Sequence, residues 1–254
     1  MKSIFISIFC IVITSPFLFG ISKNKIENKK KTTTKGSGFA LVELFTSEGC
    51  SSCPSADALI AGLSRGMQSN IFILSYHVDY WNRLGWKDKF SSPLSTQRQQ
   101  DYVSHFGLNG AYTPQIVVNG SEEFIGSIKS KLYTSINKNI ESNTTKTTIN
   151  ITATKIGNRL VIKGNTALLK DYNLCIALVQ LNGSSDVKHG ENKGKFLEHI
   201  NIVQGLKTID AMDIEKEINF SVVPNFVSSE HNIIAFLQHK ESYDVLAAAK
   251  CAIN

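Results

Sequence analysis

Two cysteines separated by two serines, Cys50 and Cys53, are the residues of this sequence with the most evident chemistry. A C-x-x-C pair occurs in zinc sites, in structural disulfides and in redox-active disulfides. A zinc site normally needs a second pair of ligands, and the sequence contains no other C-x-x-C and no H-x-H or H-x-x-x-H motif. We therefore expect the pair to interconvert between dithiol and disulfide, with no metal ion and no cofactor.

The neighbouring residues place this pair at the start of a helix. Residues 39–45 (FALVELF) form a nearly continuous apolar run, as a buried strand does. Pro54 suits a first helical turn, and apolar residues then recur at helical spacing. Unpaired N–H groups and the helix dipole favour a thiolate at such a position. We therefore predict Cys50 as the attacking nucleophile and Cys53, inside the first turn, as the resolving thiol.

Residues 38–143 have the alternating pattern of an α/β domain. Beyond the helix that follows the cysteines, we expect a strand, a second helix, two more strands and a closing helix. The pair Asn119-Gly120 between the last two strands is a strong hairpin signal. These elements are expected at residues 71–76, 93–106, 115–118, 124–126 and 127–141.

Residues 144–254 have a strand-rich pattern instead. Residues 147–153 and 159–164 alternate around the turn pair Gly157-Asn158, as the strands of a hairpin do. The regular spacing of turns favours a small antiparallel β-sandwich-like domain after the α/β domain. The further strands are expected at residues 174–181, 217–223, 232–238 and 245–252.

The N-terminal segment has the pattern of a secretion signal. Lys2 precedes an apolar run, which predicts a signal peptide over residues 1–22. An uncleaved anchor is the alternative, because about 18 apolar residues can just span a bilayer. Residues 23–37 are rich in lysine, asparagine and threonine and are expected to form a flexible basic linker. A secreted or periplasmic location follows, where disulfides persist.

The net charge of +6 lies almost entirely in this N-terminal segment. Residues 1–35 hold seven lysines and one glutamate, which leaves 20 basic and 20 acidic residues of the totals of 27 and 21. The rest of the chain is therefore formally neutral. We expect no nucleic-acid partner, because such proteins carry basic surfaces. Membrane contact is expected only through an uncleaved N-terminal segment.

Several stretches of the chain resemble one family of bacterial secreted proteins, described as domain of unknown function 1223. The stretches are VELFTSEGCSSCPSADALI, SYHVDYWNRLGWKDKFSSPLSTQRQ, AYTPQIVVNG and HGENKGKFLEHINIVQGL. The likeness covers nearly all of residues 38–254, and the order of elements resembles the thioredoxin fold. It implies a thioredoxin-like domain at residues 38–143 with an appended β domain at residues 144–254, and no established substrate.

By this resemblance, Thr113 and Pro114 correspond to the cis proline that faces the C-x-x-C of thioredoxin-like proteins. A cis X-Pro bond is uncommon and is usually placed for a reason. Here it would expose backbone groups beside the sulfurs that can hydrogen-bond an extended substrate. The alternative is an ordinary trans proline at the start of a strand.

Glu43 is a carboxylate within the apolar run of the first strand. Burial raises the pKa of a carboxyl group, which would allow Glu43 to exchange a proton with Cys53. Thioredoxin-like enzymes often carry a buried acid near this point, although here the spacing to the first cysteine is one residue longer. The alternative is a glutamate at a sheet edge that reaches solvent.

His77, Tyr80 and Trp81 follow the second predicted strand, where loops of open α/β sheets line binding crevices. We expect these three side chains to contribute to substrate binding. Alternatively, Trp81 and Trp86 pack the loop against the domain. His77 could instead join the two cysteine thiolates in a copper site.

Two further groups of residues offer chemistry. His189, Glu191, Glu198 and His199 have the side-chain types of metal ligands, but we expect a solvated, charged loop there and no metal. Cys175 and Cys251 lie in two predicted strands, and a structural disulfide and two buried free thiols both remain open.

The sequence as a whole predicts a thiol–disulfide oxidoreductase-like protein of the cell envelope that acts on protein or small-molecule thiols. One alternative is a non-catalytic thioredoxin-like binding module in which Cys50 and Cys53 form a structural disulfide. The other is a copper-handling protein.

Overall fold

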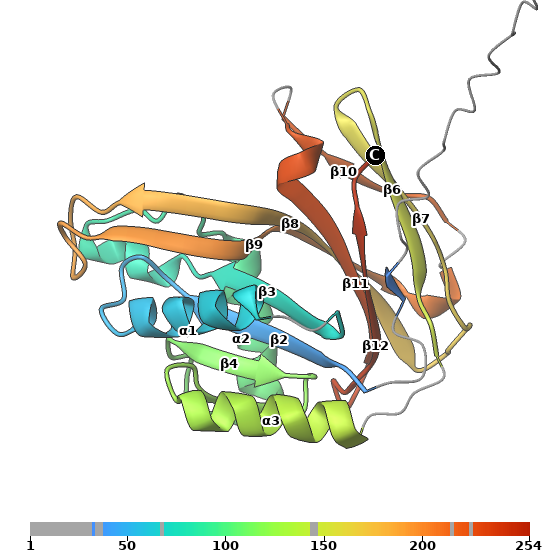
Figure 1. Cartoon of the computed structure of the whole chain (residues 1–254), viewed down its shortest axis with the longest axis horizontal. Helices are drawn as coiled ribbons and strands as arrows, with labels where there is room; N and C mark the ends of the chain where they lie inside the picture. The colour runs from blue at the N-terminus through green and yellow to red at the C-terminus, as the bar shows by residue number, and fades with distance from the viewer. Residues whose placement is uncertain (1–31, 34–37, 67–68, 143–146, 214–215, 224–225) are drawn as a thin grey trace, which may run out of the picture. The chain divides into compact units, whose positions relative to one another are not determined.

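The computed structural model describes residues 32–33, 38–66, 69–142, 147–213, 216–223 and 226–254 (Figure 1). Residues 31–254 form one compact unit. The predicted signal peptide or anchor, residues 1–22, and most of the predicted linker lie outside the described residues. Within the described ranges, no helix is both long enough and apolar enough to cross a membrane.

A nine-stranded mixed sheet carries most of the described chain. Strands β2 and β3 run parallel, β4 and β5 are antiparallel to β2, and β9 pairs with β3 through Ser75 and Ile202. The strand order is β1 (Thr32–Thr33), β12 (Val245–Ala252), β11 (His231–His239), β8 (Tyr172–Asp186), β9 (Phe196–Asp210), β3 (Ile71–His77), β2 (Ala40–Thr46), β4 (Gln115–Val118) and β5 (Glu122–Ile125).

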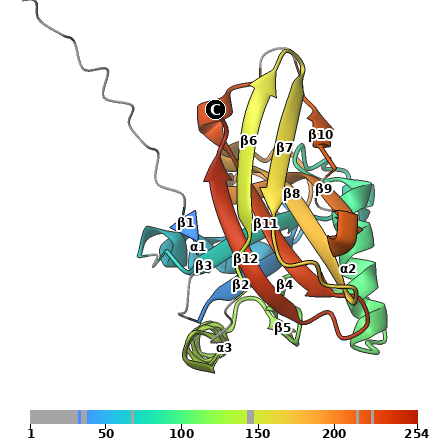
Figure 2. The same cartoon turned by 90° about the vertical axis from the view of Figure 1, so that its right-hand side faces the viewer.

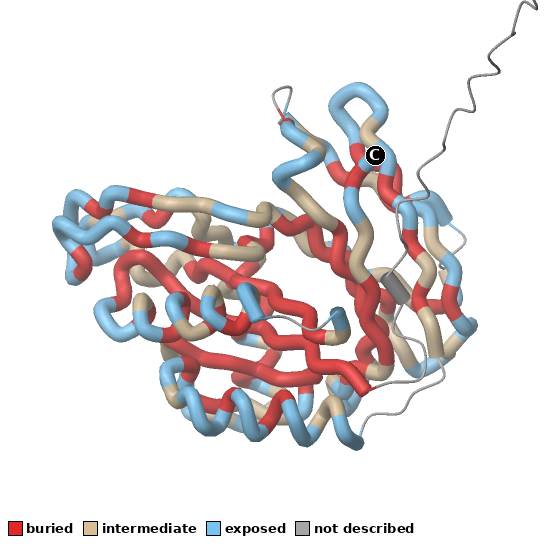
Figure 3. Tube along the Cα trace, in the orientation of Figure 1, coloured by how far each residue is buried: buried red, intermediate tan, exposed pale blue. Residues whose placement is uncertain are grey.

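Helices cover both faces of the β2–β3 part of this sheet (Figure 1). They are α1 (Cys53–Arg65), α2 (Pro93–His105) and α3 (Lys129–Ser142), and a 3-10 helix, η1 (Tyr80–Leu84), precedes α2. Because successive side chains of a strand point to opposite faces, Val42 and Leu44 pack with α1 and α3, whereas Leu41 and Phe45 pack on the side of α2. Strands β2 and β3 are buried throughout (Figure 3).

A second, three-stranded antiparallel sheet packs against the part of the large sheet formed by β8, β11 and β12 (Figure 2). It consists of β10 (Ile218–Ser221), β7 (Arg159–Asn165) and β6 (Asn150–Ile156). Its apolar side chains share a core with those of β8, β11 and β12, to which Ile162 contributes from the small sheet and Ile176 and Ala235 from the large sheet. The C-terminal half therefore contains two packed antiparallel layers. One of these layers also continues into the sheet of the N-terminal half.

Two sequence predictions are wrong at the level of strands. The stretch expected to be a charged loop is in part β9, a 15-residue strand that pairs with β8 and β3. Its buried positions include the polar residue His199. The sequence therefore does not show the alternation of apolar and polar residues that indicates a strand. In the predicted flexible linker, Thr32 and Thr33 form β1 and pair with Ala249 and Lys250 of β12.

Cys175 and Cys251 are free thiols. Cys175 of β8 pairs with Phe236 of β11, and Cys251 of β12 pairs with Ile233 on the opposite side of β11. Strands separated by one intervening strand lie about 9.5 Å apart, and a disulfide requires Cα atoms within about 7 Å. The intervening strand therefore prevents the disulfide that the sequence left open.

Burial also makes these two thiols poor nucleophiles. It raises the pKa of Cys175 and raises that of Cys251 to about 11. We expect alkylation of Cys251 by iodoacetamide to accelerate about 90-fold between pH 8 and pH 10, against about 10-fold for a thiol of pKa 9, because only the thiolate reacts. Mass spectrometry of the oxidised protein measures this rate, with Cys251→Ser as the control. Labelling of Cys251 at the rate of a free peptide thiol at pH 8 would contradict the prediction.

Candidate functional site

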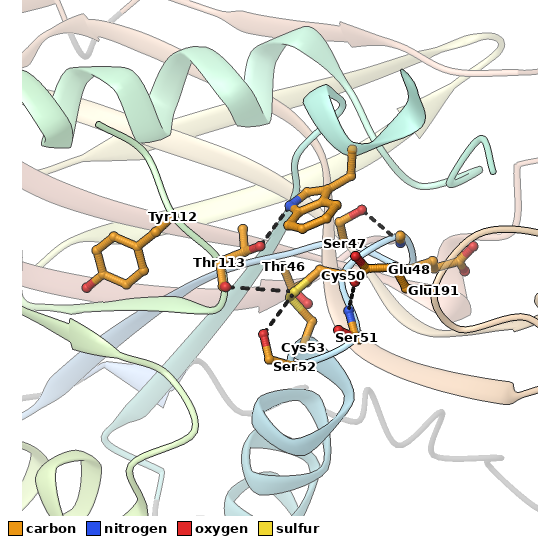
Figure 4. Close-up of a disulfide and its surroundings, with 12 residues drawn as sticks. Thr46, Ser47, Glu48, Cys50, Ser51, Ser52, Cys53, Tyr112, Thr113 and Glu191 are labelled. Atoms are coloured by element: carbon orange, nitrogen blue, oxygen red, sulfur yellow. Dashed lines mark hydrogen bonds between the residues drawn. A yellow bond between two sulfur atoms is a disulfide. The ribbon is translucent and has the colours of Figure 1, made fainter. Parts of the chain in front are cut away.

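Cys50 and Cys53 form a disulfide in the segment that joins β2 to α1 (Figure 4). Their Cα atoms are 5.4 Å apart, and Cys53 is the first residue of α1. Two turns shape the segment, because the N–H of Cys50 donates to the carbonyl of Ser47 and the N–H of Cys53 donates to that of Cys50, each at 3.2 Å. Cys50 is 1% exposed and Cys53 is fully buried. A partner thiol can therefore reach Cys50 only after the covering groups move.

The Thr113-Pro114 peptide bond is cis and lies opposite the disulfide. Cys50 Sγ is 3.8 Å from the carbonyl oxygen of Thr113 and 3.4 Å from the hydroxyl of Ser52. The structure therefore brings together Cys50, Cys53, Thr113 and Pro114, as the sequence predicted. The carbonyl of Thr113 is positioned to accept a hydrogen bond from the thiol of Cys50 in the reduced protein.

Trp81 of η1 covers this site from one side. Its indole N–H donates to the hydroxyl of Thr113 at 2.8 Å. The backbone of Gly49 lies so close that a Cβ atom there would meet Cβ of Trp81 at 3.0 Å. Trp81 thus lies against the disulfide loop, and its neighbour Tyr80 is half-buried beside it, with ring centroids 6.4 Å apart.

The loop between β8 and β9 holds the disulfide segment from the other side. The carboxylate of Glu191 accepts a hydrogen bond from the N–H of Ser51 at 2.9 Å (Figure 4). The amide of Asn192 donates to the carbonyls of Glu48 and Cys50, at 2.9 and 2.8 Å. Asn192 is fully buried, so the prediction of a solvated loop is wrong here. Sequence reasoning missed Asn192 altogether.

A pair of glycines gives the β8–β9 loop its shape. Gly190 and Gly194 both have positive φ angles, +74° and +84°, a conformation that residues with a Cβ rarely adopt. They let the chain turn back so that the N–H of Gly194 reaches the carbonyl of Val187 at 2.8 Å. A tight loop of this kind presents Glu191 and Asn192 in fixed positions.

Glu43 lies on the face of β2 that packs against α2, away from α1. Arg98 of α2 donates two hydrogen bonds to its carboxylate, at 3.0 and 2.9 Å, and the hydroxyl of Tyr102 donates a third at 2.5 Å. Because Glu43 is fully buried, the alternative of a solvent-exposed glutamate at a sheet edge is wrong. The two partners on α2 favour a structural role for Glu43 rather than proton exchange with Cys53.

His77 is the last residue of β3 and is fully buried. Its Nδ1 atom lies 2.6 Å from the carboxylate of Asp88, which also accepts the N–H groups of Glu48 and Phe90. Burial alone would raise the pKa of Asp88, but the charge and hydrogen bond of His77 lower it overall. The other contacts of the His77 ring are with Phe90 and His199.

His199 of β9 joins this region to helix α1. Its Nδ1 and Nε2 atoms lie 3.5 Å from Asp57 and 3.4 Å from Glu48. Burial by itself would lower the pKa of His199, but Asp57 and Glu48, with a further contribution from Asp88, raise it to about 9. Asp57, His77 and His199 form a group of possible metal ligands. This group, found among the described residues, contains neither Cys50 nor Cys53.

These features define a class: proteins with a mixed α/β sheet and a C-x-x-C disulfide at a helix start, faced by a cis proline. The chain belongs to the family described as Protein of unknown function (DUF1223), whose model matches residues 41–238. The resemblance noted from the sequence motifs is thereby confirmed.

Four chains of known structure match this one. One is a crystal structure of a protein from Agrobacterium tumefaciens, 25% identical, with a TM-score of 0.62 over 86% of this chain and 96% of that one. Another is HBP35 of Porphyromonas gingivalis, 16% identical, with a TM-score of 0.57 over 86% of this chain and 76% of that one. At 16% identity, the similarity to HBP35 shows only that the two proteins share a fold. No curated protein matches the chain.

Proposed function

We propose that this protein is a thiol–disulfide oxidoreductase of the cell envelope that acts on protein or small-molecule thiols through Cys50 and Cys53. The observation that carries the proposal is the position of the Cys50 sulfur, at the start of α1 and 3.8 Å from the carbonyl that precedes a cis proline. The helix start favours the thiolate form of Cys50. The carbonyl beside Pro114 offers a hydrogen-bond acceptor to an extended substrate.

The proposal includes a thioredoxin-like domain at residues 38–143. Its support is the order β2, α1, β3, α2, β4, β5, α3, in which β2 and β3 are parallel and the β4–β5 hairpin is antiparallel to β2. A secreted or periplasmic location is part of the same proposal. It is supported by the leader-like pattern of residues 1–22 and by the disulfide, which persists in oxidising compartments.

The chemistry proceeds in two exchange steps. In the reduced protein, the thiolate of Cys50 attacks one sulfur of a substrate disulfide, and the other substrate sulfur leaves as a thiolate. Cys53 then attacks the Cys50 sulfur of the mixed disulfide and releases the second substrate thiolate. The two protons of the dithiol pass to the two substrate thiolates. The reverse sequence oxidises a substrate dithiol.

The burial of both sulfurs favours a second candidate, a binding module with a fixed disulfide. Asn192 and Glu191 hold the segment that contains Cys50, and Trp81 covers it. Exchange therefore requires Trp81 to swing away or the β8–β9 loop to lift. In a binding module neither motion is needed, and the disulfide serves only to stabilise the loop.

The reduction potential of the Cys50–Cys53 couple distinguishes the two candidates. We expect a value between that of thioredoxin, about −270 mV, and that of strongly oxidising periplasmic enzymes, about −120 mV. Equilibration in glutathione or dithiothreitol buffers, with mass spectrometry of alkylated thiols, measures it. A value below about −300 mV indicates a structural disulfide and rejects the redox proposal.

A variant at the covering side chain tests access separately. Trp81→Ala should accelerate reduction by dithiothreitol and leave the potential nearly unchanged, because it removes a barrier and not a charge. Leu84→Ala, an exposed apolar change in the same 3-10 helix, is the matched control and should have no effect on the rate. An unchanged rate in Trp81→Ala would show that this side chain does not limit access.

A further inference from the structure

Three buried side chains from distant parts of the sequence meet beside the disulfide loop. Asp57 comes from α1, His77 from the end of β3 and His199 from β9. They are 7%, 0% and 2% exposed, and one ligand atom of each lies within 4.8 Å of the others. We propose that Asp57, His77 and His199 bind a divalent transition-metal cation of the Zn²⁺ class.

Three of the four histidine ring nitrogens of this group have no hydrogen-bond partner. His77 Nε2 and both ring nitrogens of His199 are buried without one. A buried polar atom without a partner costs free energy, on the order of 1–3 kcal/mol for each such atom. A divalent cation bound to the two imidazoles would offset that cost, and it would replace the proton of the His199 ring, which is released to solvent.

Each of the two histidines has a carboxylate beside its outer ring nitrogen. Asp88 lies 2.6 Å from His77 Nδ1, which leaves Nε2 for a cation. Glu48 lies 3.4 Å from His199 Nε2, which leaves Nδ1, itself 3.5 Å from Asp57 Oδ1. The hydrogen bond between Asp88 and His77 is the usual support of a metal-binding histidine, because it fixes the tautomer and orients the ring. Glu48 makes only a longer ionic contact with His199.

The third ligand has the same kind of support. The hydroxyl of Thr46 donates to Asp57 Oδ2 at 2.9 Å, so Oδ1 faces His199. The site thus has three inner ligand atoms, with Asp88 beside His77, and with Thr46 and Glu48, from the end of β2 and the turn after it, beside the other two ligands.

The donor set selects the class of cation. Two imidazoles and one carboxylate suit Zn²⁺, Fe²⁺ and related first-row divalent ions. Mg²⁺ and Ca²⁺ prefer oxygen ligands only. The group contains no thiolate, so it differs from the copper site of two cysteines and His77 considered from the sequence, and it does not depend on the redox proposal.

A route from solvent reaches the site. A pocket of about 300 Å³ between α1 and β9 is lined in part by Asp57 and His199. Three protein ligands leave a coordination position for water or a small ligand, and the pocket opens on the side of these two ligands. We take this pocket as the entry path that a metal site requires.

Metal titration of the full-length protein tests the proposal. The protein is stripped with a chelator, kept with Cys50–Cys53 oxidised, and titrated with Zn²⁺ by calorimetry and with Co²⁺ by visible absorption. We expect one equivalent of each ion to bind and the thermal midpoint to rise. Asp57→Asn and His199→Gln should each abolish the cobalt spectrum, and Asp88→Asn should weaken binding about 10- to 100-fold.

The controls separate this site from other sources of binding. His189→Gln changes an exposed histidine outside the group and should bind as the wild type does. Cys50→Ser/Cys53→Ser should also bind normally, because neither thiol is a ligand. The circular dichroism of each variant establishes that it folds. Failure of the wild type to bind either ion would overturn the proposal. Binding equal to that of the wild type by folded Asp57→Asn and His199→Gln would also overturn it. Both results are independent of the outcome of the redox experiments.

Discussion

Cys50→Ser should abolish thiol–disulfide exchange, whereas Cys53→Ser should accumulate a mixed disulfide with the substrate. Cys50 is the thiol that faces the Thr113 carbonyl and the start of the helix, so its removal leaves no attacking group. Cys53 is fully buried in the first turn of α1. Without it, the bond between Cys50 and a substrate sulfur has no internal thiolate to break it.

The measurement is the rate at which each variant, in its reduced form, reduces oxidised glutathione or a peptide disulfide, followed by non-reducing mass spectrometry. We expect the rate for Cys50→Ser to equal the buffer background and the mass of Cys53→Ser to increase by one substrate thiol. Cys251→Ser is the matched control, since it removes a thiol that lies in another strand. Exchange by Cys50→Ser at the wild-type rate would exclude our assignment of the nucleophile.

Arg98→Met should be among the most destabilising single substitutions in this protein. Arg98 is buried, donates to both carboxylate oxygens of Glu43, and also donates to Gln238 of β11. Burial alone would lower the pKa of Arg98, but the charge of Glu43 raises it overall, so the guanidinium stays charged. Its removal leaves the Glu43 carboxylate in the core without a cation, which costs about 3–5 kcal/mol.

Urea unfolding followed by circular dichroism measures this loss. The double variant Glu43→Leu/Arg98→Met should be more stable than Arg98→Met alone, because no unpaired charge remains in the core. Arg65→Met, an exposed change in the last turn of α1, should cost about 1 kcal/mol or less. A loss of the same small size in Arg98→Met would mean that the ion pair with Glu43 contributes little.

The two buried carboxylates Glu43 and Asp57 have different expected roles. Glu43 is bound on the α2 side of the sheet, whereas Asp57 lies on α1, one turn after Cys53. Substitution of Glu43 should therefore affect stability, and substitution of Asp57 should affect metal binding. The sequence had placed chemistry at Glu43 and had not singled out Asp57.

Much of the local structure could be predicted from the sequence. Strands β4 and β12 have the predicted bounds, and α2 differs from its prediction by one residue. Asn119 and Gly120 both adopt positive φ angles, as a tight hairpin turn requires. The pair Cys50 and Cys53 begins a helix, also as predicted. Such features depend on a few adjacent residues, so hydrophobic periodicity and turn residues are sufficient to find them.

The partners of buried polar residues were decided only by the tertiary structure. Nothing near Glu43 in the sequence indicates Arg98, and nothing near His77 indicates His199. Each pairing depends on the register between segments far apart in the chain, above all on β9, which reaches β3 through the contact of Ser75 with Ile202. Local sequence therefore determined where the disulfide lies, and long-range packing determined that a cluster of histidines and carboxylates lies beside it.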